Sequence, residues 1–131
     1  MLFRSWFHTG DVATLDDGWL TIVGRKKDVI IRGGENIAPA EVERVVAAHP
    51  AVRECAAVGV PDDRLGESVC VFVVGDRSFD LDECRRWFAV REVARFKTPE
   101  RVEHLDALPT LAAGKVDRAA LRARAVDLPD R

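Results

Sequence analysis

The sequence predicts an α+β fold, in which a small mixed sheet of about three strands is flanked by helices and preceded by an N-terminal β-hairpin. Two nearly continuous apolar runs, CAAVGV at 55–60 and VCVFVV at 69–74, have the composition expected of central strands in a sheet. Three further segments carry apolar residues at helical spacing. Strands and helices in this mixture are expected to pack in layers around one core.

The N-terminal hairpin is predicted by its turn. Apolar-rich runs, VATL at 12–15 and WLTIV at 19–23, flank an Asp-Gly pair at 17–18, which is a strong signal for a tight turn between two strands. The apolar surface of this hairpin has no obvious cover elsewhere in the chain. The hairpin is therefore expected to be disordered or to pair with a second copy of the chain as a dimer.

Shorter elements complete the sheet. The run VII at 29–31 is typical of a short strand, and it is broken by Gly33 and Gly34, which permit backbone angles that other residues avoid. RVEHL at 101–105 is expected to be another strand. The last residues, 126–131, are expected to fray.

The three predicted helices have recognisable ends. The first begins at Pro39, which suits a first helical turn, and ends before Pro50. The second begins at Asp80, and Glu83 three residues later completes a capping signal. The third begins near Asp117 and carries arginines toward its end, as the helix dipole favours.

Composition excludes several classes of protein. The 131 residues suffice for one modest core, and 47% hydrophobic with 32% charged residues is ordinary for a globular domain. A net charge of -2 gives no electrostatic argument for nucleic acid or an anionic membrane as partner. No apolar run approaches the roughly 20 residues of a membrane span. The start lacks the apolar region of a secretory signal.

Three cysteines indicate a reducing compartment. Cys55, Cys70 and Cys84 are odd in number, lack metal-ligand spacing and lie among apolar neighbours. We expect buried, reduced thiols in a cytoplasmic protein, and no metal site.

One lysine stands out in an otherwise apolar loop. Lys115 follows Gly114 in LPTLAAGKV at 108–116, which superficially resembles the phosphate-binding pattern G-x-x-x-x-G-K-[ST]. Pro109 occupies the first glycine position and has no N–H for a phosphate. Val116 occupies the serine or threonine position and has no hydroxyl for magnesium. The phosphate-loop interpretation therefore fails.

Four stretches, in order along the chain, carry a family resemblance. They are WFHTGD at 6–11, GRKKDVIIRGGENIAPAEVE at 24–43, VPDDRLGES at 60–68 and LPTLAAGKV at 108–116. Together they resemble the C-terminal part of the adenylate-forming superfamily, which holds acyl-CoA synthetases, aryl-acid ligases, peptide-synthetase adenylation domains and beetle luciferases. The resemblance covers essentially the whole chain.

The resemblance implies a division into two parts. Residues 1–24 would be the end of a large N-terminal domain, and residues 25–131 a small C-terminal domain that rotates against it. The large domain, with its phosphate loop, adenine pocket and acid pocket, would be the partner of this domain. Because these features are not found in the 131 residues, this chain alone is expected to be inactive.

The resemblance also implies a two-step reaction. A small carboxylic acid attacks ATP to give an acyl-adenylate and pyrophosphate, and a thiol, usually that of CoA, then forms a thioester. ATP, CoA and Mg²⁺ are the expected ligands, held mainly by the N-terminal domain. The leading interpretation is an acyl-CoA synthetase. The alternatives are an aryl-acid ligase that loads a carrier-protein thiol and, in another class, a free-standing binding module without enzymatic activity.

Lys115 corresponds to the catalytic lysine of the family. Its cation would offset the repulsion between the acid and the ATP phosphates and hold the nucleophile in line. The loop departs from the family pattern at Thr110 and Leu111, where a basic residue and a threonine are usual. In acyl-CoA synthetases this context is also a site of acetylation, which would remove the charge. Taken alone, Gly-Lys would instead suggest a solvated surface lysine.

The resemblance assigns ATP-side roles to three more residues. Asp11 would accept hydrogen bonds from both ribose hydroxyls, Arg25 would lie near ribose and phosphate, and Lys27 would be the hinge. The alternatives are a turn aspartate, an exposed hairpin arginine and a solvated basic face.

Four residues are assigned to the CoA side. Gly33 and Gly34 would line the tunnel for the pantetheine arm, because glycine lets a thin ligand pass close to the backbone. Phe96 and Lys97 would contact the CoA nucleotide. A plain turn is the alternative for the glycines.

Overall fold

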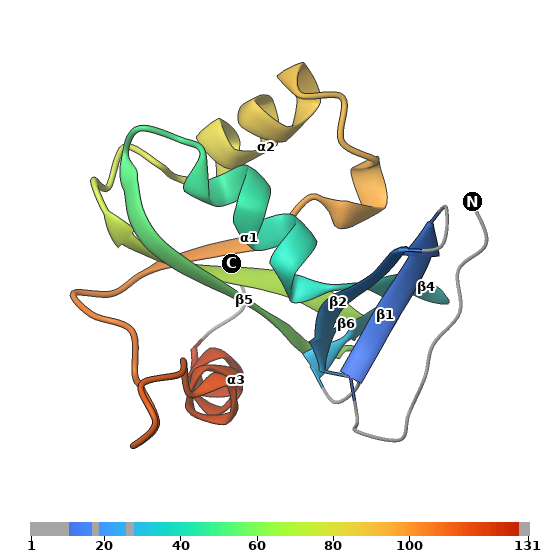
Figure 1. Ribbon diagram of the computed structural model, residues 1–131. Helices are drawn as coiled ribbons and strands as arrows, with labels where there is room; N and C mark the ends of the chain where they lie inside the picture. Colours follow the sequence, from blue (N-terminus) through green and yellow to red (C-terminus); the bar gives the residue numbers. More distant parts are fainter. Residues whose placement is uncertain (1–10, 17–18, 26–27, 129–131) are drawn as a thin grey trace.

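The computed structural model describes residues 11–16, 19–25 and 28–128. Two helices, α1 and α2, cover one face of a sheet, and α3 covers the other, so the layers are helix, sheet and helix (Figure 1). The predicted α+β class is confirmed. In chain order the strands and helices are β1 (Asp11–Asp16), β2 (Trp19–Arg25), β3 (Ile30–Arg32), β4 (Glu35–Ile37), α1 (Pro39–Ala47), β5 (Val52–Asp62), β6 (Gly66–Gly75), α2 (Leu81–Val90), the 3-10 helix η2 (Arg95–Lys97), β7 (Arg101–His104) and α3 (Arg118–Asp127).

The main sheet is mixed and has β6 at its centre. Its strands follow the order β4-β3-β6-β5, and β7 also pairs with β6. β5 is antiparallel to β6, whereas β7 is parallel to it. The sheet is five-stranded, so the expectation of about three strands was too low.

The strand β4, which the sequence did not predict, arises from the double glycine. Gly33 and Gly34 have φ of 56° and 86°, and they join the paired residues Arg32 and Glu35. Two central residues with positive φ make a type I′ turn, which folds a chain back on itself as a tight hairpin. Residues 35–37 are therefore drawn into a strand, which their short sequence of two polar residues and one isoleucine does not predict.

The two long strands extend beyond their apolar runs. β5 and β6 pair as far as Asp62 with Gly66, so most of the loop predicted at 61–67 is strand. Asp62 stabilises the remaining turn, because its Oδ1 accepts hydrogen bonds from the backbone N–H groups of Arg64 and Leu65, both at 2.9 Å. The same hydrogen bonds lower the pKa of the Asp62 carboxyl.

The apolar runs are continuous because both sheet faces are covered. Side chains of β6 point alternately to the two faces. Val69, Val71 and Val73 belong to the core under α1 and α2, while Cys70 and Phe72 belong to the core under α3. The prediction of a central strand is confirmed for β6 but is wrong for β5, which lies at the edge of the sheet. Its apolar run reflects the cover that α1 and α3 give to its two faces.

Helix ends follow the predicted caps. Asp80 accepts a hydrogen bond from the N–H of Glu83 at 2.9 Å, and Asp117 accepts one from the N–H of Ala120 at 3.0 Å. α1 begins at Pro39 as predicted. α3 continues to Asp127, so the expected frayed tail begins later than residue 126.

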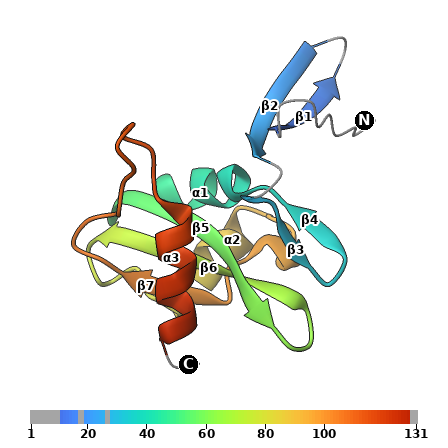
Figure 2. The ribbon, with the colours of Figure 1, turned by 90° about the horizontal axis from the view of Figure 1, so that it is seen from below.

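The hairpin β1–β2 forms as predicted and extends away from the layers (Figure 2). Its turn at 17–18 lies outside the described residues. Pairing of this hairpin with a second copy stays a prediction. None of the helices in the described ranges has the length and apolar character that a membrane span requires.

All three cysteines are free; Cys70 and Cys84 are buried, and Cys55 is half-buried. Burial raises the pKa of each thiol to about 12. We expect slow alkylation of the folded protein at pH 8 and fast alkylation in denaturant, measured by mass spectrometry. Equal alkylation rates in the folded and the denatured protein would contradict this prediction.

The raised thiol pKa values also make the stability depend on pH. Because the folded thiols keep protons that the unfolded chain releases, the free energy of unfolding should fall as the pH rises above about 9.

Candidate functional site

Lys115 lies on a small hairpin-like loop between β7 and α3. Thr110 and Val116 form an isolated antiparallel bridge, and the N–H of Leu111 donates to the carbonyl oxygen of Lys115 at 2.7 Å. The N–H of Gly114 donates to the carbonyl oxygen of Leu111 at 2.8 Å. These bonds give the loop a defined backbone, and the side chain of Lys115 is exposed at its end.

Gly114 makes this loop geometry possible. Its φ is 85°, in the region that side chains with a Cβ rarely adopt, and no atom lies within 4 Å of where a Cβ would stand. A turn followed by a residue of positive φ is the usual construction of a three-residue hairpin loop. The glycine is therefore required for backbone conformation, while the space around it is open.

The foot of the loop is packed although its tip is not. Leu105, Leu108 and Val116 pack against the core under α3. The N–H of Asp117 donates to the carbonyl oxygen of Pro109 at 2.8 Å, which closes the loop at its base. The loop thus projects from a packed base beside the start of α3 (Figure 2).

The ATP-side residues of the hairpin can be placed only in part. Asp11 and Arg25 are cross-strand partners at the open end of β1–β2. The structure therefore brings the backbones of these two predicted ribose and phosphate residues side by side. Lys27 lies outside the described residues.

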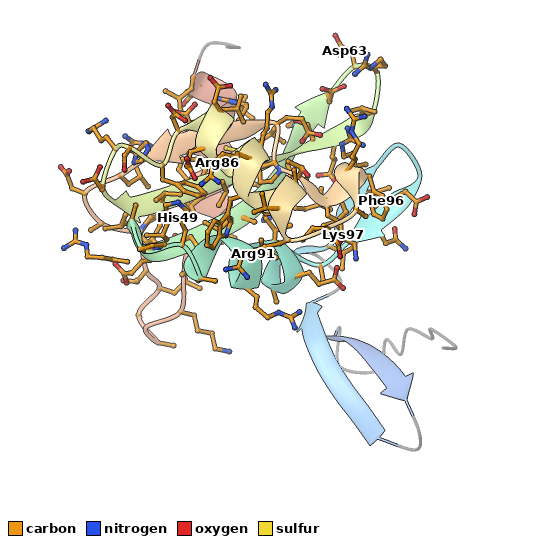
Figure 3. The ribbon with its side chains drawn as sticks, turned by 90° about the horizontal axis from the view of Figure 1, so that it is seen from above. His49, Asp63, Arg86, Arg91, Phe96 and Lys97 are labelled. Carbon is orange, nitrogen blue, oxygen red and sulfur yellow. The ribbon has the colours of Figure 1, made fainter. Side chains whose placement is uncertain are left out.

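Of the four residues predicted to contact CoA, Lys97 lines a groove between α1 and the segment that follows α2. The groove has a volume of about 580 Å³ and is lined by both helices and by Lys97. The Lys97 Nζ lies 2.8 Å from Glu41 Oε2 and 5.6 Å from the centre of the Phe96 ring. Phe96 packs against the core, so its ring is held in place (Figure 3).

A second cation borders the same groove. Arg91 lines it, and its guanidinium carbon lies 4.0 Å from the centre of the Trp87 ring. Trp87 itself is fixed, since its Nε1 donates to the carbonyl oxygen of Val45 at 2.8 Å. Stacked or paired cations beside an apolar wall can hold an anionic, planar ligand.

The two sets of residues lie at opposite ends of the domain. The Lys115 loop is at one end of the sheet, and the Gly33–Gly34 turn and η2 are at the other, in both ribbon views (Figures 1 and 2). A domain that turns can present two such ends to one substrate site in succession.

A cluster of charged residues near the Lys115 loop was missed by the sequence analysis. It consists of Asp28, Glu43, Arg118 and Arg122, which come from the chain before β3, from α1 and from α3. Glu43 and Arg118 are 75 positions apart. No local pattern predicts such a contact, because charge spacing along a helix does not say which distant residue lies opposite.

Within the described part of the chain, no three His, Cys, Asp or Glu side chains are grouped as a metal site would require. Mg²⁺ is held in proteins by one or two carboxylates together with substrate phosphates. A Mg²⁺ ion that arrives with ATP therefore does not require such a group of side chains in this domain.

Comparison with known proteins gives the family. The AMP-binding enzyme C-terminal domain family matches residues 41–115. The chain is 49% identical over 127 residues to a feruloyl-CoA synthase from Amycolatopsis, covering 95% of this chain and 26% of that protein. It is 46% identical over 120 residues to a long-chain-fatty-acid–CoA ligase from Escherichia coli, covering 91% of this chain and 21% of that protein.

Solved structures agree. ATP-bound MatB from Rhodopseudomonas palustris matches with a TM-score of 0.81 and 36% identity, over 91% of this chain and 24% of that one. The o-succinylbenzoate-CoA synthetase of Bacillus subtilis, with an acyl-adenylate bound, matches with a TM-score of 0.80 and 37% identity, over 87% of this chain and 24% of that one. The chain thus spans about a quarter of the length of these relatives. It belongs to the AMP-binding enzyme C-terminal domain family.

Proposed function

We propose that this chain carries the mobile C-terminal domain of an ATP-dependent carboxylic acid–CoA ligase. Residues 25–131 form the domain, and residues 1–24 are the end of the large domain that precedes it. The observation that carries the proposal is the placement of two candidate sites at opposite ends of one layered body (Figure 1). A domain of this kind serves two successive reactions by turning one end and then the other toward the same substrates.

The Lys115 end serves the first reaction. Negative charge accumulates where a carboxylate approaches the α-phosphate of ATP, and an exposed ammonium group on a projecting loop can enter that region from outside. The cation stabilises the charge of the transition state and keeps the carboxylate in line. The acyl-adenylate and pyrophosphate are the products of this step.

The hairpin and the segment after it contribute to nucleotide binding and to rotation. Asp11 accepts hydrogen bonds from the ribose hydroxyls, and Arg25 contacts the ribose and phosphate region. Lys27 is the residue at which the small domain turns. Mg²⁺ is assigned to the large domain and to the ATP phosphates, and ATP and CoA are the substrates. The reduced cysteines favour a cytoplasmic location.

The opposite end serves thioester formation. The Gly33–Gly34 turn presents backbone without side chains to the pantetheine arm of CoA. Phe96 and Lys97 contact the CoA nucleotide, where Lys97 exchanges its ion pair with Glu41 for an anionic group of CoA.

Replacing Lys97 with alanine is expected to raise the KM for CoA by about tenfold, because one charge-assisted contact is lost. The rate of adenylate formation should stay within about twofold. Arg95→Ala is the matched control, since Arg95 is an exposed cation in the same short helix. Steady-state kinetics with CoA as the varied substrate measure the effect. An unchanged KM for CoA would remove Lys97 from the binding site.

The proposed function is tested with the longer protein that contains this domain. Carboxylate-dependent exchange of pyrophosphate into ATP and CoA-dependent release of AMP are measured over a panel of acids. We expect both activities in the longer protein and neither in the 131-residue chain. The proposal fails if no acid supports either activity in the longer protein, or if the 131-residue chain alone catalyses the exchange.

A further inference from the structure

We propose that Arg118 is a positioning residue for Lys115, and that Asp28 and Glu43 hold it in place. The inference rests on the proposed function of Lys115 in adenylate formation. Together with Arg122 these residues form the charged cluster described above. The cluster ties the base of the Lys115 loop to the chain segment directly after the proposed hinge residue, Lys27.

The guanidinium group of Arg118 is held by hydrogen bonds to two residues. Its guanidinium donates to Glu43, with Nη1 at 2.8 Å from Oε2 and Nη2 at 3.2 Å from Oε1. Nη1 also donates to the carbonyl oxygen of Ala57 at 2.8 Å. The side chains of Arg118 and Glu43 are only 23% and 19% exposed, so water competes weakly for these bonds.

The same contacts close an open edge of the sheet. β5 is an edge strand, and Ala57 presents its N–H and its carbonyl oxygen away from β6. Glu43 Oε2 accepts a hydrogen bond from this N–H at 2.8 Å, and Arg118 Nη1 donates one to the carbonyl oxygen at 2.8 Å. Glu43 and Arg118 thus act as a pair that replaces a missing neighbouring strand. α1, β5 and the first residue of α3 are thereby joined at one point.

Asp28 connects this point to the hinge segment. Its carboxylate lies 4.0 Å from Arg118 Nε and 3.6 Å from Arg122 Nη1, and its side chain is 14% exposed. Arg118 and Arg122 are one helical turn apart, so a single carboxylate reaches both. Asp28 directly follows Lys27 in the chain.

The position of the Lys115 loop depends on where α3 begins. In the described chain, the hydrogen bonds made by the N–H groups of Leu111, Gly114 and Asp117 remain within the loop. The loop therefore moves as one piece with its base, and Arg118 is three residues after Lys115. A displacement of about 1 Å at a reacting group can reduce a rate by about 100-fold, so this anchor matters for catalysis. Through Asp28, the same anchor makes the loop rotate together with the chain segment that directly follows the proposed hinge residue.

The test compares the two half-reactions in the longer protein. Arg118→Gln is expected to lower kcat for adenylate formation by about tenfold or more, with KM for ATP and for the acid within about twofold. Thioester formation from supplied acyl-adenylate and CoA should stay within about twofold. The matched control, Arg124→Gln, alters an exposed arginine of the same helix and should change neither. Equal losses in both half-reactions, or no loss, would overturn the proposal.

A second variant and a second readout keep the test decisive. Asp28→Asn leaves the Glu43–Arg118 pair intact and should show the same split between half-reactions, about threefold in kcat. In the 131-residue chain, Arg118→Gln should speed hydrogen exchange of the loop N–H groups by about tenfold, because their base is released. Unchanged exchange would contradict the anchor. If Lys115→Ala leaves adenylate formation intact, the proposed function fails; if only Arg118→Gln is silent, this inference alone fails.

Discussion

Replacing Lys115 with alanine is expected to slow carboxylate-dependent pyrophosphate exchange in the longer protein by about 100-fold or more, the effect of removing a preorganised charge from a developing oxyanion. The side chain is exposed and lies on a loop whose backbone bonds do not involve it. The free energy of unfolding should therefore change by less than about 0.5 kcal/mol.

Two control variants distinguish the effect of the lost charge from any effect of altering the loop. Lys115→Arg keeps the cation on a longer, planar group and should restore part of the rate. Thr110→Ala alters an exposed residue at the other side of the loop and should stay within about twofold. Full exchange activity in Lys115→Ala would show that the lysine is only a solvated surface residue.

Replacing Phe72 with alanine is expected to destabilise the 131-residue chain by about 3–5 kcal/mol. Phe72 is 0% exposed on the central strand β6 and lies in the core that also contains Leu121 and Ala125 of α3. Removing the ring leaves a cavity between the sheet and the helix. The free energy of unfolding of a typical domain is about 5–15 kcal/mol, so this loss is a large fraction of the total stability.

Urea unfolding followed by circular dichroism measures this effect. Val126→Ala is the control, because Val126 is on the same helix α3 but is 61% exposed; it should cost less than about 0.5 kcal/mol. A cost below about 1 kcal/mol for Phe72→Ala would contradict the packing of α3 against β6.

Local signals predicted most elements of the fold. The apolar runs at 55–60 and 69–74 were correctly interpreted as strands because side chains on both faces of β5 and β6 are covered. The prediction of Asp80 and Asp117 as N-caps was correct, because an N-cap depends only on residues within the next helical turn.

Elements that depend on distant partners were not predicted. β4 is only three residues long, with a single apolar residue, Ile37, and it exists because the glycine turn returns the chain to β3. Pro61 and Asp62 become strand because Glu67 and Gly66 pair with them. Their own composition suggests a loop.

The candidate site likewise combines residues that local sequence identified with contacts between distant residues that it did not. The resemblance singled out Lys115, Gly33 and Gly34 one at a time, but the sequence contained no information on the distance between the two ends. The cluster around Arg118 was missed for a related reason. Its ion pairs join residues that are far apart in the chain and that individually have the charge pattern of a solvated surface.

In the proposed function, one domain serves two reactions with two different ends. Measuring both half-reactions for Lys115→Ala and Lys97→Ala in the same longer protein tests this most directly. We expect opposite patterns: Lys115→Ala loses adenylate formation and keeps thioester formation from supplied acyl-adenylate, whereas Lys97→Ala keeps the first and loses CoA affinity in the second. If both variants weaken the same half-reaction, the two ends do not alternate and the account is wrong.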